Sequence, residues 1–502
     1  MLNRLLFFCL LPLTATFAAE VNPLEGVIKS LLDQFRNADK KNEFNVTSHT
    51  IQIPSDPLSY KAITGTLDQY TNEGVVAGKL FFTAYIKDSE EKNRPVTFIF
   101  NGGPGGSALA MHIGGLGPRR LLLPEEGQKT LPPYQLIDNQ ETLLDTTDLV
   151  FVDPMSSGYS ETKRPEFLSS FHSVEGDLYS FTEFIRMFCI HFDRWNSPKY
   201  LMGASYGTAR ACGLAESLLE MGIHLNGIIL LSPALDYQTL ICNRDLPIAE
   251  CLRLPTFAAT SWYHKKTMQD KTLAEIVDYA RKFAYETYLP AMIRPFWQSP
   301  LEQEAFYQNL SDLIGLPSGT IRRYQARINE SLFVTEFLAS SRKLIGGVDA
   351  RYIGDMSSLG AEYIEDPSYQ DIRPAFYPSF LHYMQNELET HSEFPKYINF
   401  STEAFLSWNW WTYDNAHTYP NFSQKLRRAL VSNPSMKVFV GSGYYDIRTP
   451  FAAAEYSIDR LELPASYRTN FQNEYYEAGH GFIFDLPSLK KFKQDLTKFY
   501  AN

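Results

Sequence analysis

The chain has 502 residues, 44% of them hydrophobic and 21% charged, with a formal net charge of −11 at pH 7. This balance excludes a disordered chain, and the length suffices for one large domain with an insertion or for two ordinary domains. The acidic balance argues against nucleic acid as a partner, because basic clusters such as Arg119-Arg120 are too short to follow a phosphate backbone.

The N-terminus has the pattern of an export signal. Arg4 precedes an apolar run from Leu5 to Leu13, and Thr16-Phe17-Ala18 provides small residues at a cleavage site. We therefore predict a signal peptide over residues 1–18 and a secreted or periplasmic protein; a buried N-terminal helix is the alternative. The run is too short to cross a bilayer, and no later segment is apolar enough to be a membrane span.

Strand-like segments follow in a regular order. After a helical lead-in over 19–50, we expect strands at 61–70 and 78–86, and then short apolar runs that each end in a glycine- or proline-rich turn. Such runs, separated by segments of helix length, indicate a mostly parallel sheet with helices on both faces, hence an α/β fold. They occupy residues 96–100, 148–152, 199–202, 227–231 and 436–440.

The region from 241 to 400 lacks such apolar runs and is rich in helix formers and aromatic residues. We predict that it is a mainly helical cap inserted into an α/β core, and that the two parts of this core span 19–240 and 401–502.

The first of the turns, Asn101-Gly102-Gly103-Pro104-Gly105-Gly106, consists mostly of glycine. A glycine-rich loop after an early strand exposes the backbone N–H groups that an oxyanion hole requires. A phosphate-binding loop is the alternative, but no Lys-Ser/Thr follows and Pro104 lacks one donor.

The segment Gly203-Ala204-Ser205-Tyr206-Gly207 lies between an apolar run and a helical stretch at 209–221. This is the pattern of a nucleophile elbow, in which a serine occupies a strained strand-to-helix turn. The helix N-terminus directs amide groups at the place where negative charge develops. The pattern predicts Ser205 as a nucleophile in an α/β-hydrolase core.

A serine nucleophile needs a base and an orienting acid from later loops. His480, in Ala478-Gly479-His480-Gly481, follows the strand-like segment 472–476, and Asp446 follows the run at 436–440. The order Ser, Asp, His is the order of α/β hydrolases; Asp414 and Asp485 are the rivals for the acid. We expect His480 to take the proton of Ser205, Asp446 to hold the imidazole, and the amides of Gly103 and Tyr206 to bind the oxyanion.

Four cysteines remain once Cys9 is removed with the signal peptide. Cys242 and Cys251 are near enough in sequence to form a disulfide if their geometry permits, and we expect Cys189 and Cys212 to be buried thiols. The chain has no Cys-x-x-Cys pair and no His-Glu-x-x-His motif, so we predict neither a metal site nor a cofactor.

Taken together, these motifs resemble the serine carboxypeptidase family, and the resemblance extends over most of the mature chain. It rests on Asn-Gly-Gly-Pro-Gly at 101–105, Leu-Gly-Pro at 116–118, Gly-x-Ser-Tyr-Gly at 203–207, Gly-x-x-Asp-x-x-x-Pro ending at Pro450, and Ala-Gly-His at 478–480. The resemblance implies an α/β-hydrolase core with a helical insertion, and release of C-terminal residues from peptides.

The sequence departs from this family where the family binds the free carboxylate of its substrate. The resemblance implies an Asn and two Glu residues there; Asn101 supplies the Asn, while Ala204 and Gly115 replace the two Glu residues. We expect Asn101 and Gly102 to contact the substrate, and a cation, Arg119, Arg120 or Arg448, to bind the carboxylate. Structural ion pairs are the alternative role for the two adjacent arginines.

The sequence therefore predicts a serine-type carboxypeptidase acting on a peptide or acyl substrate. An esterase or acyltransferase with the same triad is the first alternative, because these reactions share an acyl-enzyme and the two Glu residues are missing. A binding protein on an inherited fold is the second alternative. The oligomeric state cannot be predicted from the sequence.

Overall fold

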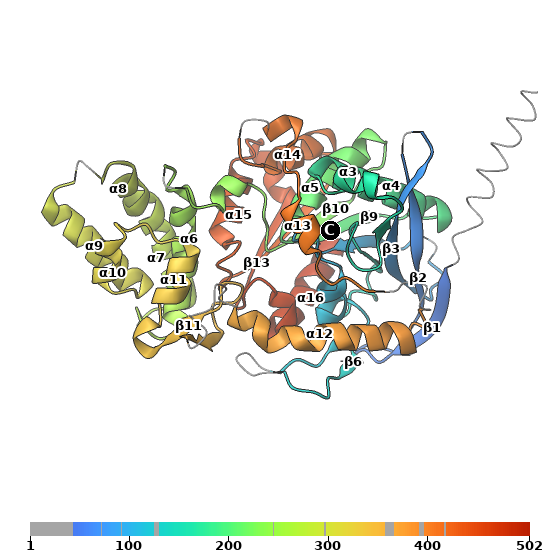
Figure 1. The fold of residues 1–502 in the computed structure, drawn as a ribbon, viewed down its shortest axis with the longest axis horizontal. Coiled ribbons are helices and arrows are strands. Elements are labelled where there is room, and N and C mark those ends of the chain that lie inside the picture. The colour runs from blue at the N-terminus through green and yellow to red at the C-terminus, as the bar shows by residue number, and fades with distance from the viewer. Residues whose placement is uncertain are drawn as a thin grey trace, which may run out of the picture. The chain divides into compact units, whose positions relative to one another are not determined.

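A ten-stranded sheet forms the centre of the protein, which we describe from a computed structural model (Figure 1). The described residues are 44–501 without 72, 92, 125–129, 244, 296–297, 357–365, 391–395 and 416–417, so the predicted signal peptide lies outside them. The strand order is β1-β2-β3-β7-β4-β9-β10-β13-β14, and β8 pairs with β3. The strands are β1 (Asn45–Ile51), β2 (Leu58–Tyr70), β3 (Val76–Lys87), β4 (Val96–Phe100), β7 (Asp148–Val152), β8 (Glu161–Thr162), β9 (Lys199–Ala204), β10 (Gly227–Leu231), β13 (Lys437–Gly443) and β14 (Phe471–Tyr476).

The strands from β7 to β14 pair in parallel, while β1, β2 and β3 form an antiparallel extension that joins β7. The mostly parallel sheet that the sequence predicts is confirmed, and β4, β7 and β10 occupy the predicted residues. The helical lead-in was wrong over 45–50, where β1 lies, and its residues 19–43 lie outside the described ones. The side chains of β1 alternate in burial, as in an edge strand with one covered face, and this period of two differs from the helical one.

Both faces of the sheet are covered, which explains why the central parallel strands β4, β7 and β10 are mostly apolar and buried along their whole length. Phe98 and Phe100 pack into one core together with helices α4 (Val174–His191), α5 (Tyr206–Glu220) and α14 (Ser423–Ser432). Ile99, from the other side of the same strand, packs into a second core with α12 (Pro367–Asn386) and α16 (Leu486–Ala501).

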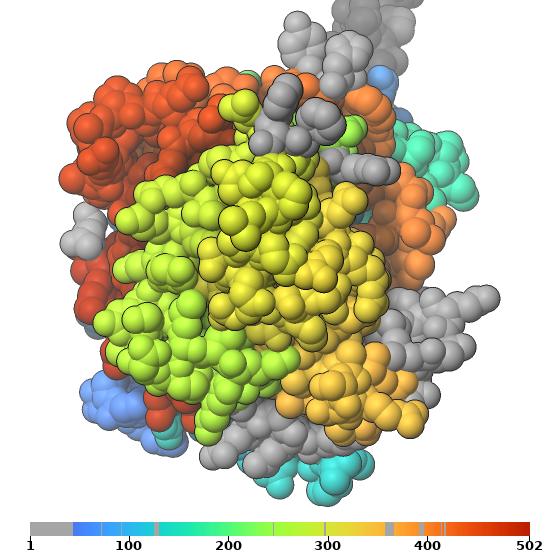
Figure 2. Space-filling model, turned by 90° about the vertical axis from the view of Figure 1, so that its left-hand side faces the viewer, coloured from blue at the N-terminus to red at the C-terminus, as the bar shows by residue number. Residues whose placement is uncertain are grey.

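A third core belongs mainly to residues 248–355, in the first part of the segment between β10 and β13. Its helices form the face that Figure 2 shows in green and yellow, and a small antiparallel pair of strands outside the main sheet follows them. The elements are α6 (Ile248–Tyr263), α7 (Leu273–Phe283), α8 (Leu289–Ile293), α9 (Pro300–Ile314), α10 (Ser318–Arg323), α11 (Glu330–Glu336), β11 (Lys343–Ile345) and β12 (Ile353–Asp355). Tyr445, Ile447 and Phe451, which surround the predicted acid, are part of this core.

Shorter elements complete the chain. They are α2 (Leu109–Met111), β5 (Arg119–Leu121), β6 (Leu136–Asp138), α3 (Leu168–Phe171), α13 (Thr402–Leu406) and α15 (Phe451–Asp459).

The parallel register brings the predicted site loops to one edge of the sheet. Phe100 pairs with Gly203, and Leu231 pairs with both Ala204 and Gly441. The turns that follow β4, β9, β10 and β13 therefore leave the sheet side by side at its carboxyl edge, where ligands of open α/β sheets bind.

Candidate active site

The turn at Ser205 has the strained geometry that the sequence motif predicts. Ser205 lies between β9 and α5 with φ 56° and ψ −126°, a conformation that L residues rarely adopt outside functional turns. Gly203 and Gly207 approach closely, since a Cβ atom at Gly203 would lie 2.0 Å from the Gly207 carbonyl oxygen. This strained turn places Ser205 just beyond the carboxyl end of β9 and directly before the first residue of α5.

The glycine-rich loop after β4 packs directly on this turn. A Cβ atom at Gly102 would lie 2.6 Å from the Tyr206 nitrogen and 2.9 Å from the Ser205 Cβ. Gly103 has φ 118°, and within the described part of the chain its N–H has no backbone acceptor. The Tyr206 N–H belongs to the first turn of α5, where amides have no acceptor within the helix. Both predicted oxyanion donors therefore lie in loops that contact each other.

The predicted base and acid are hydrogen bonded. His480 Nδ1 lies 2.7 Å from Asp446 Oδ2, and the Asp446 side chain is fully buried while 17% of the His480 side chain is exposed. With Nδ1–H assigned as the donor to this carboxylate, Nε2 is the free acceptor of the ring. The two rival acids have other partners: Asp414 pairs with Arg428, and Asp485 with Arg351.

One residue that the sequence analysis did not single out also holds the acid. The Thr449 hydroxyl donates to Asp446 Oδ2 at 2.6 Å, and the Thr449 amide donates to Oδ1 at 2.9 Å. A Thr three residues after an Asp is the available signal, because this spacing suits a local side chain–backbone turn.

The end of β10 connects the serine turn with the histidine loop. The Ser205 amide donates to the Leu231 carbonyl at 3.0 Å. The next residue, Ser232, donates its hydroxyl to the His480 carbonyl at 2.8 Å, and its own carbonyl oxygen lies 3.2 Å from the Thr449 hydroxyl oxygen. Within the described residues, the Ser205 hydroxyl and the imidazole do not form a hydrogen bond with each other. Such contacts often form only with substrate bound.

The helical region contributes a second support for the histidine loop. The His480 amide donates to the Val348 carbonyl at 2.7 Å, and the Gly479 amide donates to Asp349 Oδ2 at 3.0 Å. The neighbouring Arg351 donates to the Glu477 carbonyl at 2.9 Å. No sequence motif marked these residues, because their role depends on a contact between distant segments.

The two positions that lack Glu have different surroundings. A Cβ atom at Gly115 would lie 2.5 Å from the Ile483 carbonyl oxygen, so a side chain there requires the backbone to move. Ala204 is half-buried at the end of β9, and Asn101, also half-buried, donates its Nδ2 to the Ser107 carbonyl at 3.2 Å.

The three candidate arginines occupy different surroundings. Arg119 pairs with Asp138 and Glu387, as in a structural ion pair. Arg120 lines a cavity of about 960 Å³ rich in tyrosines. Arg448, two residues after Asp446, pairs with Glu330 at 3.0 Å.

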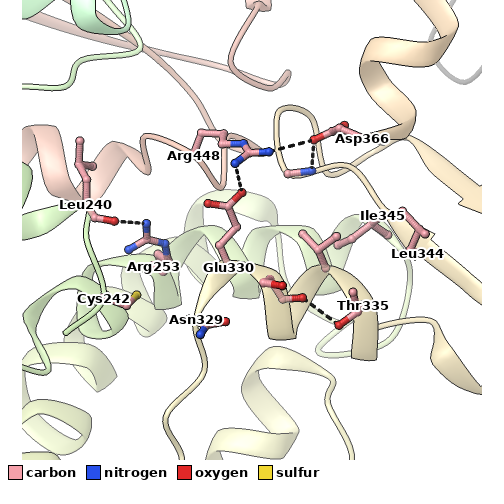
Figure 3. A pocket seen from close by; sticks show the side chains of 13 residues that line it. Leu240, Cys242, Arg253, Asn329, Glu330, Thr335, Leu344, Ile345, Asp366 and Arg448 are labelled. Atoms are coloured by element: carbon pink, nitrogen blue, oxygen red, sulfur yellow. Dashed lines mark hydrogen bonds and ion pairs between the residues drawn. The ribbon is translucent and has the colours of Figure 1, made fainter. Parts of the chain in front are cut away.

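Figure 3 shows the cavity of about 350 Å³ that Arg448 lines beside the acid loop. Arg448 lies between Glu330 and Asp366, and the buried Arg253 donates to the neighbouring Leu240 carbonyl. Neither this cavity nor the larger one is lined by Ser205. Arg448 is thus the candidate cation nearest in sequence to the acid, with half of its side chain exposed.

Several other residues lie apart from these loops. His112 is buried against Phe151 and Tyr85, and burial lowers its pKa to about 3, so it is a neutral core residue. Cys189 and Cys212 are buried as expected, and Cys242 and Cys251 are free thiols rather than a disulfide. Among the described helices, none is long and apolar enough to cross a membrane.

A mostly parallel sheet, a strained serine turn after β9 and a His–Asp pair at the same edge define the α/β-hydrolase class. The serine carboxypeptidase family model matches residues 54–484, and the chain belongs to this family. It is accordingly a serine carboxypeptidase-type enzyme, as the sequence motifs predict.

One of the solved structures compared supports the fold. The prohormone-processing carboxypeptidase Kex1(delta)p from Saccharomyces cerevisiae is 14% identical with a TM-score of 0.55, covering 88% of this chain and 91% of its own. A thermostable carboxyl esterase from Bacillus coagulans is 12% identical with a TM-score of 0.35, covering 87% of this chain and 98% of its own. A comparison with curated proteins found no match.

Proposed function

We propose that the protein is a serine-type carboxypeptidase-like hydrolase that acts through an acyl-enzyme on Ser205. The Ser205 hydroxyl attacks the acyl carbon, and His480 Nε2 takes the hydroxyl proton and then gives it to the leaving amine. Asp446 keeps the ring in the required tautomer and stabilises the imidazolium. Water then attacks the ester with His480 again as the base, which releases the acid and regenerates the serine.

The oxyanion of each tetrahedral intermediate would lie between the amides of Gly103 and Tyr206. One such donor typically contributes about 3–4 kcal/mol to lowering the barrier. The close approach of Gly102 to the Tyr206 nitrogen supports this assignment, because it brings the two amide-bearing loops into contact.

The observation that carries the proposal is the hydrogen bond from His480 Nδ1 to the fully buried Asp446, at the sheet edge where Ser205 occupies its strained turn. A fluorophosphonate probe tests it. We expect the probe to label Ser205 in the wild type and not in Ser205→Ala, and labelling should slow strongly in Asp446→Asn. A folded wild-type protein without an adduct at Ser205 would leave only the non-catalytic alternative.

The substrate class depends on how the free carboxylate is recognised. Ala204 and Gly115 provide no acidic group, and the Ile483 carbonyl beside Gly115 leaves no room for a Glu. This observation favours an esterase or acyltransferase as the second candidate function. Arg448 is the more accessible cation: both arginines pair with two carboxylates, but 50% of the Arg448 side chain is exposed and only 22% of the Arg119 side chain.

A matched pair of substrates separates the two functions. A blocked dipeptide with a free C-terminus and its C-amidated form should differ in kcat/KM by tenfold or more if a carboxylate reader exists. Equal rates, together with faster transfer of an activated ester to an added alcohol, would establish the esterase or acyltransferase. Export of the chain, the expectation from its N-terminus, is tested by sequencing the N-terminus of the secreted protein.

A further inference from the structure

A buried arginine lies directly behind the proposed oxyanion hole. Arg210, on α5 five residues after Ser205, has no solvent-exposed side-chain surface. Its Nε donates to Asp177 Oδ2 at 2.8 Å, and Asp177, on α4, is 3% exposed. The guanidinium also lies 4.5 Å from the centre of the Phe181 ring.

This ion pair contacts both loops that carry the proposed oxyanion donors. Arg210 Nη1 donates to the Asn101 carbonyl at 2.7 Å, two residues before Gly103. The Tyr206 hydroxyl donates to Asp177 Oδ2 at 3.1 Å, the same oxygen that accepts from Arg210. One carboxylate and one guanidinium therefore connect the glycine-rich loop to the residue whose amide forms the other half of the hole.

A gain in folding stability does not by itself explain why this ion pair is buried. Removing two charges from water is costly, and well-packed apolar residues often replace a buried ion pair without loss of stability. Arg210 Nη2 is buried and has no hydrogen-bond partner among the described residues, which adds to the cost. A fixed spacing between the two loops is a benefit that an apolar pair cannot supply, because hydrogen bonds are directional and dispersion contacts are not.

We propose that Arg210 is a positioning residue that, through Asp177, holds the Gly103 and Tyr206 amides at the spacing the oxyanion requires. The inference rests on the proposed function, since it concerns the same site. Arg210 does not touch the substrate; it acts through the Asn101 carbonyl and through Asp177. Its removal should therefore affect the transition state more than substrate binding.

The chain offers a matched control at the opposite edge of the sheet. Arg194 also pairs with a buried carboxylate, Asp148 at 2.7 Å, and also donates to a backbone carbonyl, that of Arg94 at 2.7 Å. Asp148 begins β7, whereas Asn101 follows the end of β4, so this second ion pair lies away from the serine turn.

The test compares Arg210→Met, Arg210→Lys and Arg194→Met. For each variant KM is measured, and kcat is calculated from the concentration of active sites titrated with the fluorophosphonate. For Arg210→Met we expect kcat to fall by about ten- to a hundredfold with KM within threefold, as for a displaced oxyanion donor. Affinity for a peptide boronic acid, whose adduct occupies the hole, should fall in parallel. Arg194→Met should lower the melting temperature and leave kcat per titrated site unchanged.

Arg210→Lys distinguishes positioning from charge, because one ammonium cannot replace a guanidinium that donates in two directions. We expect its kcat to lie between the values of the wild type and Arg210→Met. If Arg210→Met does not fold, the nearly isosteric Asp177→Asn carries the same expectation, and the kcat of Arg210→Lys should still lie below that of the wild type. If the folded variants have the kcat and the boronate affinity of the wild type, the inference about Arg210 is overturned. The proposed function still holds in that case, provided that the probe labels Ser205. An unlabelled wild type would overturn both.

Discussion

Replacing Gly102 by Ala tests the contact between the glycine-rich loop and the serine turn. The new Cβ would lie 2.6 Å from both the Ala204 carbonyl oxygen and the Tyr206 nitrogen, and ordinary contact begins at 3.4 Å. Because these are backbone atoms, no side-chain rotation relieves the clash, and the loop must withdraw by about 0.8 Å. A displacement near 1 Å at a reacting centre typically costs about a hundredfold in rate.

We therefore expect Gly102→Ala to lower kcat by about 10²–10³-fold, the loss typical of one oxyanion donor. The measurement is kcat on an activated ester, with calorimetry to show that the variant is folded. Gly319→Ala is the matched control, since a Cβ there meets nothing within 4 Å, and its kcat should equal that of the wild type. A folded Gly102→Ala enzyme with kcat within threefold of the wild type would refute the reasoning.

Three further results are expected. Asp349→Ala should destabilise the protein by about 1–3 kcal/mol and lower kcat, since it leaves the Gly479 amide without its acceptor; unchanged calorimetry and kcat would exclude this support. Burial raises the pKa of Asp153 from 3.8 to about 6, so the folded state binds the carboxyl proton more tightly than the unfolded state. The contribution of Asp153 to the free energy of unfolding therefore falls by about 3 kcal/mol as the pH rises from about 4 to about 6. Asp153→Asn should remove this part of the pH dependence of the melting temperature. A reducing agent should leave the melting temperature unchanged, because Cys242 and Cys251 are free thiols, and a drop would reveal a disulfide.

The sequence was sufficient for the parallel strands because their signal is local and strong. Residues 96–100, 148–152 and 227–231 are continuous apolar runs, and each is buried on both faces in the structure. The strand at Asn45–Ile51 was missed for the opposite reason. Its residues alternate between partly exposed and exposed positions at the sheet edge, and pairing with β2 rather than local preference determines its conformation.

The candidate site also has a part that the sequence predicted and a part that only the tertiary structure shows. Short motifs predicted the turn at Ser205, the glycine-rich loop and the pairing of His480 with Asp446, because each motif reflects backbone geometry that a few adjacent residues impose. The contacts that support these residues could not be predicted from sequence. Arg210 reaches Asn101 across 109 positions and Gly479 reaches Asp349 across 130, and only the folded chain brings such partners together. Whether an arginine is free to meet a carboxylate is likewise a tertiary property, since it depends on which acids the fold places beside it.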